Sequence, residues 1–517
     1  MRRPSLVLLA LTVLAACGPT PVGAASSARF LLGAPVTLDP AALGDASSAA
    51  ITSQLFETLT TFDGEGELRP ALARSWSIED GGRRIVFHLR PDLSFSDGAP
   101  LRASDVVRSW LRVIDPDAPS PLATLLLDVD GASGYLAGDH GPDAVGLAAD
   151  DAAGTVEVTL ARPATDFVSI AASPPLGVLP PGVDQGPAAL SPGVDFVSSG
   201  GYRAVGAQGD ALVLEANPRY WAGEPAIGRI EVLSDLGGAS AVEAFEDGDL
   251  DYAPIGEFDA TWVAYDAVLG PQLRQVPSMS TDYYGFDTTR PPFDDVRVRR
   301  AVASAVDWRR IGRLALSDPS GVATSMVPPG IPGRSDRDVV PRHDPALARE
   351  LLADAGYPGG AGFPDVTLVT GGSPYDEAVL TELERELDIV VDVETMDFDT
   401  YFDRLDSEPP QMWFLSWVAD YPGRNDFLGV LLGTGASNNY GAWSSPEFDA
   451  AIAEAGAAVE PAAAGAAYDR AEDVVQRDAP VVPVSYGTGW ALSRTGLLGA
   501  TQNGMGIIRM AGLAWAD

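Results

Sequence analysis

The sequence predicts a globular protein with two or three domains that combine strands and helices. Its 517 residues are too many for one hydrophobic core. Hydrophobic residues make up 46% of the chain and charged residues 21%, which is typical of folded rather than disordered proteins. Strand and helix patterns follow one another, for example an alternating strand pattern at residues 84–89 and an amphipathic helix pattern at residues 105–114. These observations favour a mixed α/β architecture.

Further elements are marked along the chain. Residues 45–59 carry apolar side chains at helical spacing, and residues 293–307 do the same. Asp344, Pro345 and Gly356 predict another helix, because they suit the cap, the first position and the residue just past the end. The aromatic stretch at residues 413–418 reads as a buried strand.

The net charge bears on possible partners. Acidic residues outnumber basic residues by 72 to 34, which gives a formal net charge of -38. Such a chain repels phosphate backbones, so nucleic-acid binding is not expected, whereas cations are favoured by the overall field. Solubility in a harsh or saline exterior is the alternative explanation for this acidity.

The absence of lysine excludes several kinds of chemistry. All basic side chains apart from three histidines are arginines, so neither a phosphate-binding P-loop lysine nor a Schiff-base lysine is possible. His88, His140 and His343 lie far apart in sequence, and no His-Glu-x-x-His motif or cysteine pair accompanies them. Neither a metal site nor a cofactor is expected, and no Gly-x-Ser-x-Gly motif indicates a hydrolase.

The N-terminus has the pattern of an export signal. Arg2 and Arg3 precede an apolar run at residues 6–14 that is too short for a stable membrane anchor. Small residues then lead to Cys17 followed by Gly18, which resembles the bacterial lipobox. Residues 1–17 are therefore predicted to be a lipoprotein signal peptide with a lipid on Cys17, and residues 18–28 a flexible linker. A chance cysteine in an ordinary signal peptide is the alternative.

One carboxylate stands out at the end of the strand at residues 413–418. Asp420 follows this strand before the turn at Pro422, with Trp413, Trp417 and Tyr421 close in sequence. Asp420 could simply cap the turn. It could also anchor a cationic ligand group in an aromatic pocket, because a half-buried carboxylate requires a positive or hydrogen-bonding partner.

A series of short motifs recurs along the chain. The first runs from Leu68-Arg-Pro-Ala-Leu-Ala to the segment Arg90-Pro-Asp-Leu-Ser-Phe-Ser-Asp-Gly that leads to Val107. Others lie at residues 198–203, 212–221, 239–254, 283–287, 417–422, 437–441, 443–449 and 479–486. Together they resemble family 5 of the bacterial extracellular solute-binding proteins, the oligopeptide, dipeptide and nickel receptors of ABC importers.

Two positions depart from the family pattern. Arg102 stands where a Thr helix cap is usual, so that cap is expected to be weakened or moved to Ser104. Asp287 stands where Asn is usual, so a hydrogen bond donated by that amide is not assured.

The resemblance implies a two-lobed α/β fold of the periplasmic-binding-protein type, with a hinge between the lobes and an extra N-terminal subdomain. Lobe I is expected to be discontinuous and the subdomain to be inserted in it. The expected boundaries are 29–62, 196–278 and 484–517 for lobe I, 63–195 for the subdomain, and 279–483 for lobe II.

The resemblance also implies a ligand site around Asp420. In peptide-binding members the matching aspartate pairs with the ligand's free amino terminus, and the preceding strand, here residues 414–418, bonds to the ligand backbone. The loop at Asp45 and Ala46 matches the segment that closes over the ligand from the other lobe. The expected ligand-binding residues are Asp420, Trp417, Phe414, Ser416, Val418, Tyr421, Asp45, Ala46, Asn439 and Tyr486.

The implied function is capture of oligopeptides or dipeptides outside the cell. A monomer without cofactor would deliver them to an ABC permease, and a separate ATPase subunit would supply the energy. One alternative is the same fold binding a nickel chelate, an oligosaccharide or another solute, and a second is a peptide sensor. An exported hydrolase that uses paired carboxylates is a third alternative, which no motif requires.

Overall fold

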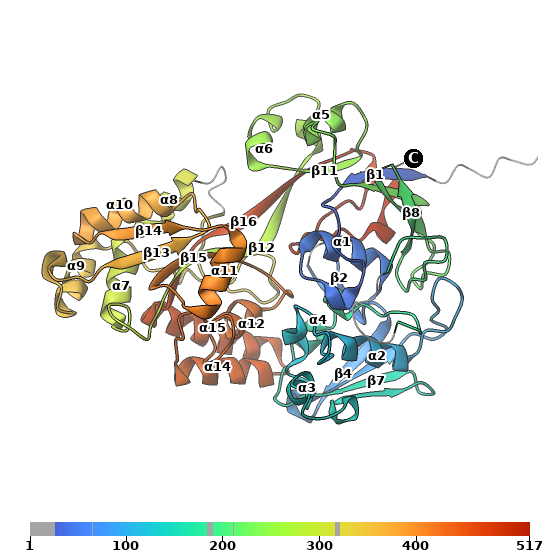
Figure 1. Cartoon of the computed structure of the whole chain (residues 1–517), viewed down its shortest axis with the longest axis horizontal. Coiled ribbons are helices and arrows are strands. Elements are labelled where there is room, and N and C mark those ends of the chain that lie inside the picture. The colour runs from blue at the N-terminus through green and yellow to red at the C-terminus, as the bar shows by residue number, and fades with distance from the viewer. Residues whose placement is uncertain (1–25, 65, 184–189, 210, 316–320, 517) are drawn as a thin grey trace, which may run out of the picture.

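The computed structural model describes residues 26–64, 66–183, 190–209, 211–315 and 321–516. The predicted signal peptide, Cys17 and most of the predicted linker lie outside these residues. The chain forms two lobes joined by long strands, with the subdomain below the first lobe in the view of Figure 1. This arrangement confirms the predicted two-lobed α/β fold.

A single mixed sheet runs through both lobes. Its strands are, in spatial order, β14 (Val391–Thr395), β13 (Val366–Thr370), β15 (Met412–Val418), β12 (Leu273–Phe286), β16 (Val481–Ser493), β11 (Tyr252–Ile255), β1 (Ser27–Leu31), β10 (Arg229–Leu233), β9 (Ala211–Ala216) and β8 (Tyr202–Gln208).

The hinge consists of β12 and β16, which pair antiparallel and pass from one lobe to the other (Figure 1). One end of β12 pairs with β15 in lobe II, and one end of β16 pairs with β11 in lobe I. The register of the β12–β16 ladder shifts between Pro277 and Thr281. Such an irregularity lets paired strands bend, and the expected boundary of lobe I at residue 278 lies there, whereas the boundary at 484 lies within β16.

Lobe I packs its part of the sheet around a core that includes Phe30, Tyr202 and Tyr252. Trp515, near the end of the chain, packs against the same core. The helices and small strands of this lobe are α1 (Ala46–Leu55), α5 (Ala241–Glu246), α6 (Glu257–Val263), β2 (Thr60–Phe62), β17 (Leu497–Leu498) and β18 (Ala514–Trp515). β2 pairs with β3 (Leu68–Pro70), where the chain enters the subdomain.

The subdomain has its own sheet and its own hydrophobic core. Its elements are β4 (Ala73–Glu79), β5 (Arg84–Leu89), β7 (Thr155–Thr159) and β6 (Leu147–Asp150) in sheet order, with α2 (Ala103–Val113), α3 (Ala132–Leu136) and α4 (Phe167–Ile170). Trp110 of α2 is fully buried in this core. A buried ion pair of 2.7 Å between Arg112 and Asp39 fastens α2 to lobe I.

At the start of α2, a different hydrogen bond partly replaces the threonine cap that is usual in the family. Arg102 remains the N-cap residue but makes no capping hydrogen bond with its side chain. Asp105, three residues on, accepts a hydrogen bond from the Arg102 backbone N–H at 2.9 Å, which forms half of a capping box. The cap is therefore weakened, as expected, and has not moved to Ser104, whose hydroxyl donates to Asp151 instead.

Lobe II covers its part of the sheet with helices. They are α7 (Val296–Ala305), α8 (Trp308–Ala315), α9 (Pro345–Asp354), α10 (Asp376–Leu387), α11 (Phe398–Ser407), α12 (Arg424–Phe427), α13 (Gly429–Leu432), α14 (Pro446–Ala457) and α15 (Pro461–Asp478). The predicted cap of α9 is confirmed, because the Asp344 carboxylate accepts a hydrogen bond of 3.0 Å from the Leu347 backbone N–H.

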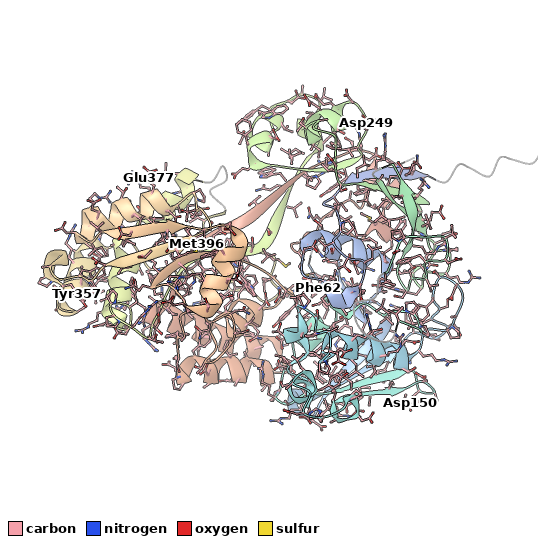
Figure 2. All side chains as sticks on the ribbon, in the orientation of Figure 1. Phe62, Asp150, Asp249, Tyr357, Glu377 and Met396 are labelled. Atoms are coloured by element: carbon pink, nitrogen blue, oxygen red, sulfur yellow. The ribbon has the colours of Figure 1, made fainter. Side chains whose placement is uncertain are left out.

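Lobe II also contacts the subdomain. The Thr165 backbone N–H donates to Gly456 O at 2.9 Å, and the Thr165 hydroxyl donates to Ala458 O at 3.2 Å. Figure 1 shows α14 and α12 beside α3 and α4 at this contact. Figure 2 places Tyr357 at the outer end of lobe II and Asp150 at the outer edge of the subdomain, so the contact lies between the two bodies.

Candidate functional site

A cleft of about 670 Å³ opens where the subdomain meets lobe II. The loop after β15, α12 and part of α14 form one wall, and the subdomain forms the other. Residues with polar side chains on the walls include Thr124, Asp128 and Arg162 from the subdomain and Asp420, Asp426 and Asp449 from lobe II. Four of these six are carboxylates, so the cleft suits a cationic ligand.

Asp420 lies in this cleft, two residues beyond the end of β15. Its backbone is held from both sides, because its N–H donates to Asp426 at 3.1 Å and its carbonyl oxygen accepts from the Ser173 hydroxyl at 3.4 Å. Within the described part of the chain, no group donates a hydrogen bond to its carboxylate. Burial without such a partner raises the pKa of Asp420 to about 6. The described residues therefore place no cation on this carboxylate, which suits a cationic group of a ligand.

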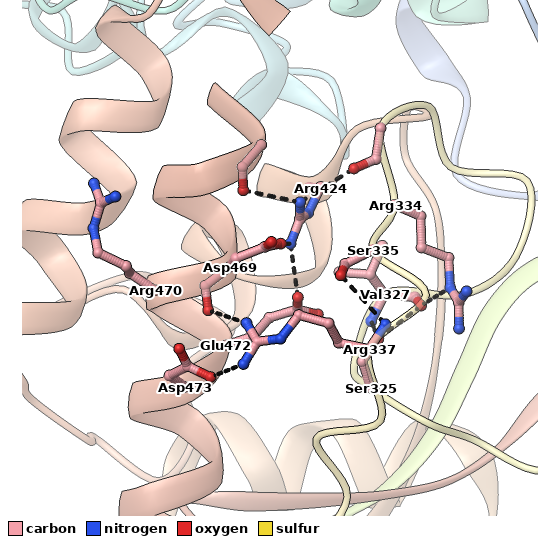
Figure 3. Close-up of polar contacts among 12 residues, drawn as sticks. Ser325, Val327, Arg334, Ser335, Arg337, Arg424, Asp469, Arg470, Glu472 and Asp473 are labelled. Atoms are coloured by element: carbon pink, nitrogen blue, oxygen red, sulfur yellow. Dashed lines mark hydrogen bonds and ion pairs between the residues drawn. The ribbon is translucent and has the colours of Figure 1, made fainter. Parts of the chain in front are cut away.

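Arg424 fixes the short helix α12 that follows. Its guanidinium is 3% exposed and donates to Glu472 at 2.7 Å and to Asp469 at 2.8 Å, both on α15. It also donates to the carbonyl oxygen of Gly333 at 3.1 Å. Figure 3 shows this network, with Arg337 reaching α15 from the neighbouring loop. The position of α12 beside the cleft thus depends on a buried ion-pair cluster in which two carboxylates meet the Arg424 charge.

Asp426, two residues further along α12, is fully buried. Its Oδ2 accepts from the Trp417 indole N–H at 3.0 Å and from the Asp420 backbone N–H at 3.1 Å. Its Oδ1 has no hydrogen-bond partner among the described residues. Burial and the neighbouring Asp420 charge raise the pKa of Asp426 well above its usual range. Asp426 is thus a buried carboxyl group that favours its protonated form.

Tyr421 joins the cleft to the subdomain. Its ring is 3% exposed and packs in the hydrophobic core of the subdomain, although it belongs to lobe II. Its hydroxyl donates to Asp166 at 2.9 Å and accepts from the Asn425 side-chain amide at 3.1 Å. Burial raises the pKa of Asp166 even though Tyr421 donates to it. The residue next to Asp420 therefore fastens lobe II to the subdomain.

The strand before Asp420 has one open edge. The Ala419 N–H donates to Met279 of β12, so the main-chain groups of Ala419 face β12. Because main-chain groups alternate between the two sides of a strand, those of Phe414, Ser416 and Val418 point away from β12. On that side β13 pairs with β15 at residues 412–413 and not beyond. The Phe414 carbonyl accepts from Tyr401, whereas Ser416 and Val418 are exposed. An extended ligand backbone could add to this edge.

The other predicted aromatic residues of this stretch are partly used inside the protein. Trp417 donates to Asp426 and packs on the lobe II core. The Phe414 ring lies 5.1 Å from that of Tyr284 and 6.0 Å from that of Tyr375. Both rings thus support the strand and its neighbours.

Of the ten predicted residues, only Asp420 and Tyr421 line this cleft. Four others, at positions 414 and 416–418, belong to the strand that leads to it, and the remaining four lie elsewhere. The Asn439 side chain donates to three backbone carbonyls of its own loop and accepts from Trp443. The Tyr486 hydroxyl bonds to the backbone of Ser325 and to the side chain of Arg334. Asp45 caps α1 by accepting from Ser48 at 2.8 Å, and Ala46 is exposed at the first position of that helix. In this conformation Asn439, Tyr486 and Asp45 support loops or a helix.

Two residues were not predicted from the sequence, Asp426, which lines the cleft, and Asp166, which bonds to Tyr421 behind it. Asp426 lies six positions after Asp420, in a helix too short to show periodicity, and Asp166 belongs to the subdomain. The sequence does carry one signal for Asp426, which stands directly before the apolar run at residues 427–432. An aspartate in such a position is prone to burial, and a buried aspartate needs a partner. Nothing in the sequence connects Asp166 with Tyr421, which is 255 positions away.

The cleft offers carboxylates and backbone groups to a ligand, and the one aromatic residue among its lining residues, Tyr421, is buried. Among the described residues, no group of His, Cys, Asp or Glu side chains is placed to hold a metal ion. In that same part of the chain, no helix has both the length and the apolar character needed to cross a membrane.

Known relatives agree with this architecture. The chain is 32% identical over 477 residues to the probable deoxycholate-binding periplasmic protein YgiS of Escherichia coli, covering 87% of this chain and 86% of that protein. It is 28% identical to the periplasmic murein peptide-binding protein MppA of Escherichia coli, covering 92% and 90%. The solved unliganded open form of the MppA murein tripeptide-binding protein superposes with a TM-score of 0.79 at 26% identity, covering 95% of this chain and 97% of that one.

The family assignment rests on a long match. Residues 67–439 match the description "Bacterial extracellular solute-binding proteins, family 5 Middle". The members of this family are binding proteins rather than enzymes, and the relatives named above are periplasmic, which supports export. The chain therefore belongs to family 5 of the bacterial extracellular solute-binding proteins.

Proposed function

We propose that this protein captures peptides outside the cell for an ABC importer, with Asp420 binding the free amino terminus of the ligand. The observation that carries the proposal is the half-buried Asp420 carboxylate at the end of an open strand edge, to which none of the described residues donates a hydrogen bond. A peptide amine is a cation with three N–H donors, which suits this carboxylate. The extended backbone that follows the amine suits the main-chain groups of Ser416 and Val418.

The rest of the machinery follows from the same proposal. The protein works as a monomer and passes its ligand to a membrane permease, and a separate ATPase subunit drives transport, since this chain has no lysine for a phosphate-binding loop. A lipid on Cys17 holds it to the membrane, and residues 18–28 act as the tether.

Calorimetric titration with a mixed pool of tripeptides to pentapeptides tests the proposal. Each pool is titrated twice, once with free amino termini and once N-acetylated, into the wild-type protein and into Asp420→Asn. We expect binding of the free-amine pool by the wild type, and loss of this binding both on acetylation and in Asp420→Asn. Asp392→Asn, which changes an exposed carboxylate on β14, is the matched control and is expected to bind as the wild type does.

Deoxycholate provides the contrasting ligand, because a relative is named as its probable binding protein. It is an anion, and the carboxylates of the cleft repel anions. We therefore expect no binding of deoxycholate. Binding of deoxycholate by a wild-type protein that takes up no peptide would overturn the peptide proposal.

A further inference from the structure

Two carboxyl groups with unsatisfied oxygens stand next to each other in the cleft. Both Asp420 and Asp426 line it. The Asp420 carboxylate has no donor among the described residues, and the Oδ1 atom of Asp426 is buried without a partner. A buried polar atom without a partner is costly, so such an atom in a folded protein requires an explanation.

The hydrogen bonds of Asp426 indicate where its proton lies. Oδ2 already accepts two N–H groups, from the Trp417 indole and from the Asp420 backbone. An oxygen that accepts two donors is a poor site for a proton, so the proton of the neutral acid belongs on Oδ1. The protonated Oδ1 of Asp426 is then a hydrogen-bond donor. The neighbouring Asp420 carboxylate, which has no other donor among the described residues, is the acceptor.

The surrounding charges do not neutralise this pair. Arg424 is committed to Glu472 and Asp469 on α15. Arg162 on the subdomain side pairs with Asp128. The other titratable groups nearby are Asp166 and Tyr421, which bond to each other, and Tyr468 on α15, which lies near Tyr421. Asp449 of α14 lines the same cleft and accepts from the Thr434 backbone N–H. The described residues thus place no free cation beside the two carboxyl groups.

We propose that Asp420 and Asp426 act as one carboxyl pair that holds a shared proton in the free protein and exchanges it for the cationic group of the ligand. The inference rests on the proposed function and adds Asp426 to it as a specificity residue. On binding, the ammonium N–H groups form hydrogen bonds to the carboxylates, and the shared proton leaves to the solvent. The net charge of the site is the same before and after the exchange, because one positive charge replaces another.

This exchange makes capture depend on pH. Burial raises the pKa of Asp420 to about 6 and that of Asp426 further above its usual range, in the absence of a cation. A bound ammonium favours the ionised carboxylates and so lowers their proton affinity. Ligand affinity should therefore fall by up to about tenfold for each pH unit below the pKa of the shared proton, and more steeply below about 6, where Asp420 is protonated as well.

Calorimetry of the wild-type protein measures the exchange directly. The free-amine peptide pool is titrated at about pH 6 in two buffers with different ionisation enthalpies, and the difference in heat gives the protons released per ligand. We expect a release of about one proton per ligand or more at this pH, and no larger release toward about pH 7.5. Binding without proton release across this range would overturn the inference.

Three variants assign the proton to the pair. In Asp426→Asn the amide can donate permanently to Asp420, so proton release should be largely lost and the affinity should depend less on pH. Asp166→Asn removes a neighbouring charge that helps to raise the pKa of Asp426 but leaves both members of the pair in place, so this variant should still release protons on binding. The exposed control Asp392→Asn should match the wild type. Equal proton release in Asp426→Asn and the wild type would contradict the role of Asp426.

The same titrations separate this inference from the proposed function. A wild-type protein that binds no peptide in any arm refutes the peptide proposal and, with it, the exchange. A wild-type protein that binds the free-amine pool but releases no proton refutes the exchange alone. If Asp426→Asn fails to fold, an NMR titration of the carboxyl carbons of the free wild-type protein replaces this variant. If Asp420 and Asp426 then titrate independently of each other, each like an ordinary aspartate, they share no proton and the inference is wrong.

Discussion

Two buried charges on the single helical turn of α12 have opposite surroundings. Arg424 is 3% exposed and its charge is met by two carboxylates and two backbone carbonyls, although its Nε has no partner among the described residues. Asp426 is 0% exposed and keeps one oxygen without a partner. The first arrangement holds the helix in place, and the second leaves a group beside the cleft that responds to protons and cations. The contrast separates a charge buried for structure from a charge that is unsatisfied at a site.

The largest expected effect concerns Arg424, the buried charge that is met by opposite charges. Replacing Arg424 by Met leaves Glu472 buried without its cation, and we expect the free energy of unfolding to fall by about 3–5 kcal/mol. Chemical denaturation measures the loss. Arg477→Met removes an exposed ion pair with Glu447 and should cost no more than about 1 kcal/mol. Equal losses in the two variants would show that the Arg424 network has no special structural role.

The next effect concerns Asp420, the carboxylate beside Asp426 in the cleft. Asp420→Asn should weaken the binding of a free-amine peptide by about 2–4 kcal/mol, because the ligand cation loses a largely desolvated ionic partner. Calorimetry with one defined tripeptide measures the change. The N-acetylated form of this tripeptide should bind the variant and the wild type with the same weak affinity, and a difference there would point to a distorted cleft instead.

The same variant should gain stability at neutral pH. The carboxyl of Asp420 has its ordinary pKa of 3.8 in the unfolded chain and a pKa of about 6 in the fold. The folded state therefore binds more protons between these values, and the stability of the wild type falls as the pH rises from the lower to the higher one. Asp420→Asn should thus be more stable by about 1–2 kcal/mol above pH 6 and gain nothing near pH 3.8. Thermal unfolding at several pH values measures this, and a gain that is independent of pH would contradict it.

The smallest effect concerns the contact with the subdomain. Tyr421→Phe removes the hydroxyl that donates to the buried Asp166, and we expect a loss of about 1 kcal/mol in the free energy of unfolding. Tyr357→Phe, which changes a tyrosine at the outer end of lobe II, should lie within about 0.5 kcal/mol of the wild type. Thermal unfolding of both variants distinguishes a contact through the hydroxyl from one through the ring alone.

Local patterns predicted the elements well where a cap or a period marks them. The helix from Pro345 to Asp354 was recognisable because Asp344, Pro345 and Gly356 act within one or two turns of the chain. The strand at residues 84–89 was recognisable in the same way. The weak cap at Arg102 was also anticipated, although the compensating hydrogen bond to Asp105 was not.

Residue roles were harder to predict than elements. Asn439 and Tyr486 stand in motifs shared with the family, yet their polar atoms serve loops in this structure. A motif shows that a residue type recurs at a position, but it does not show which of its hydrogen bonds are already occupied. Only the contacts around each side chain reveal whether a group is free for a ligand.

The sequence by itself determined the family, the mixed α/β class and the presence of an isolated carboxylate after an apolar strand. These features depend on neighbours within a few positions or on motifs that stay in order along the chain. The tertiary structure decided that Asp420 has no donor among the described residues, that Asp426 lies beside it, and that Tyr421 enters the core of the subdomain. These facts concern burial and pairing between segments as far apart as residues 166 and 421, and such distances in sequence carry no local signal.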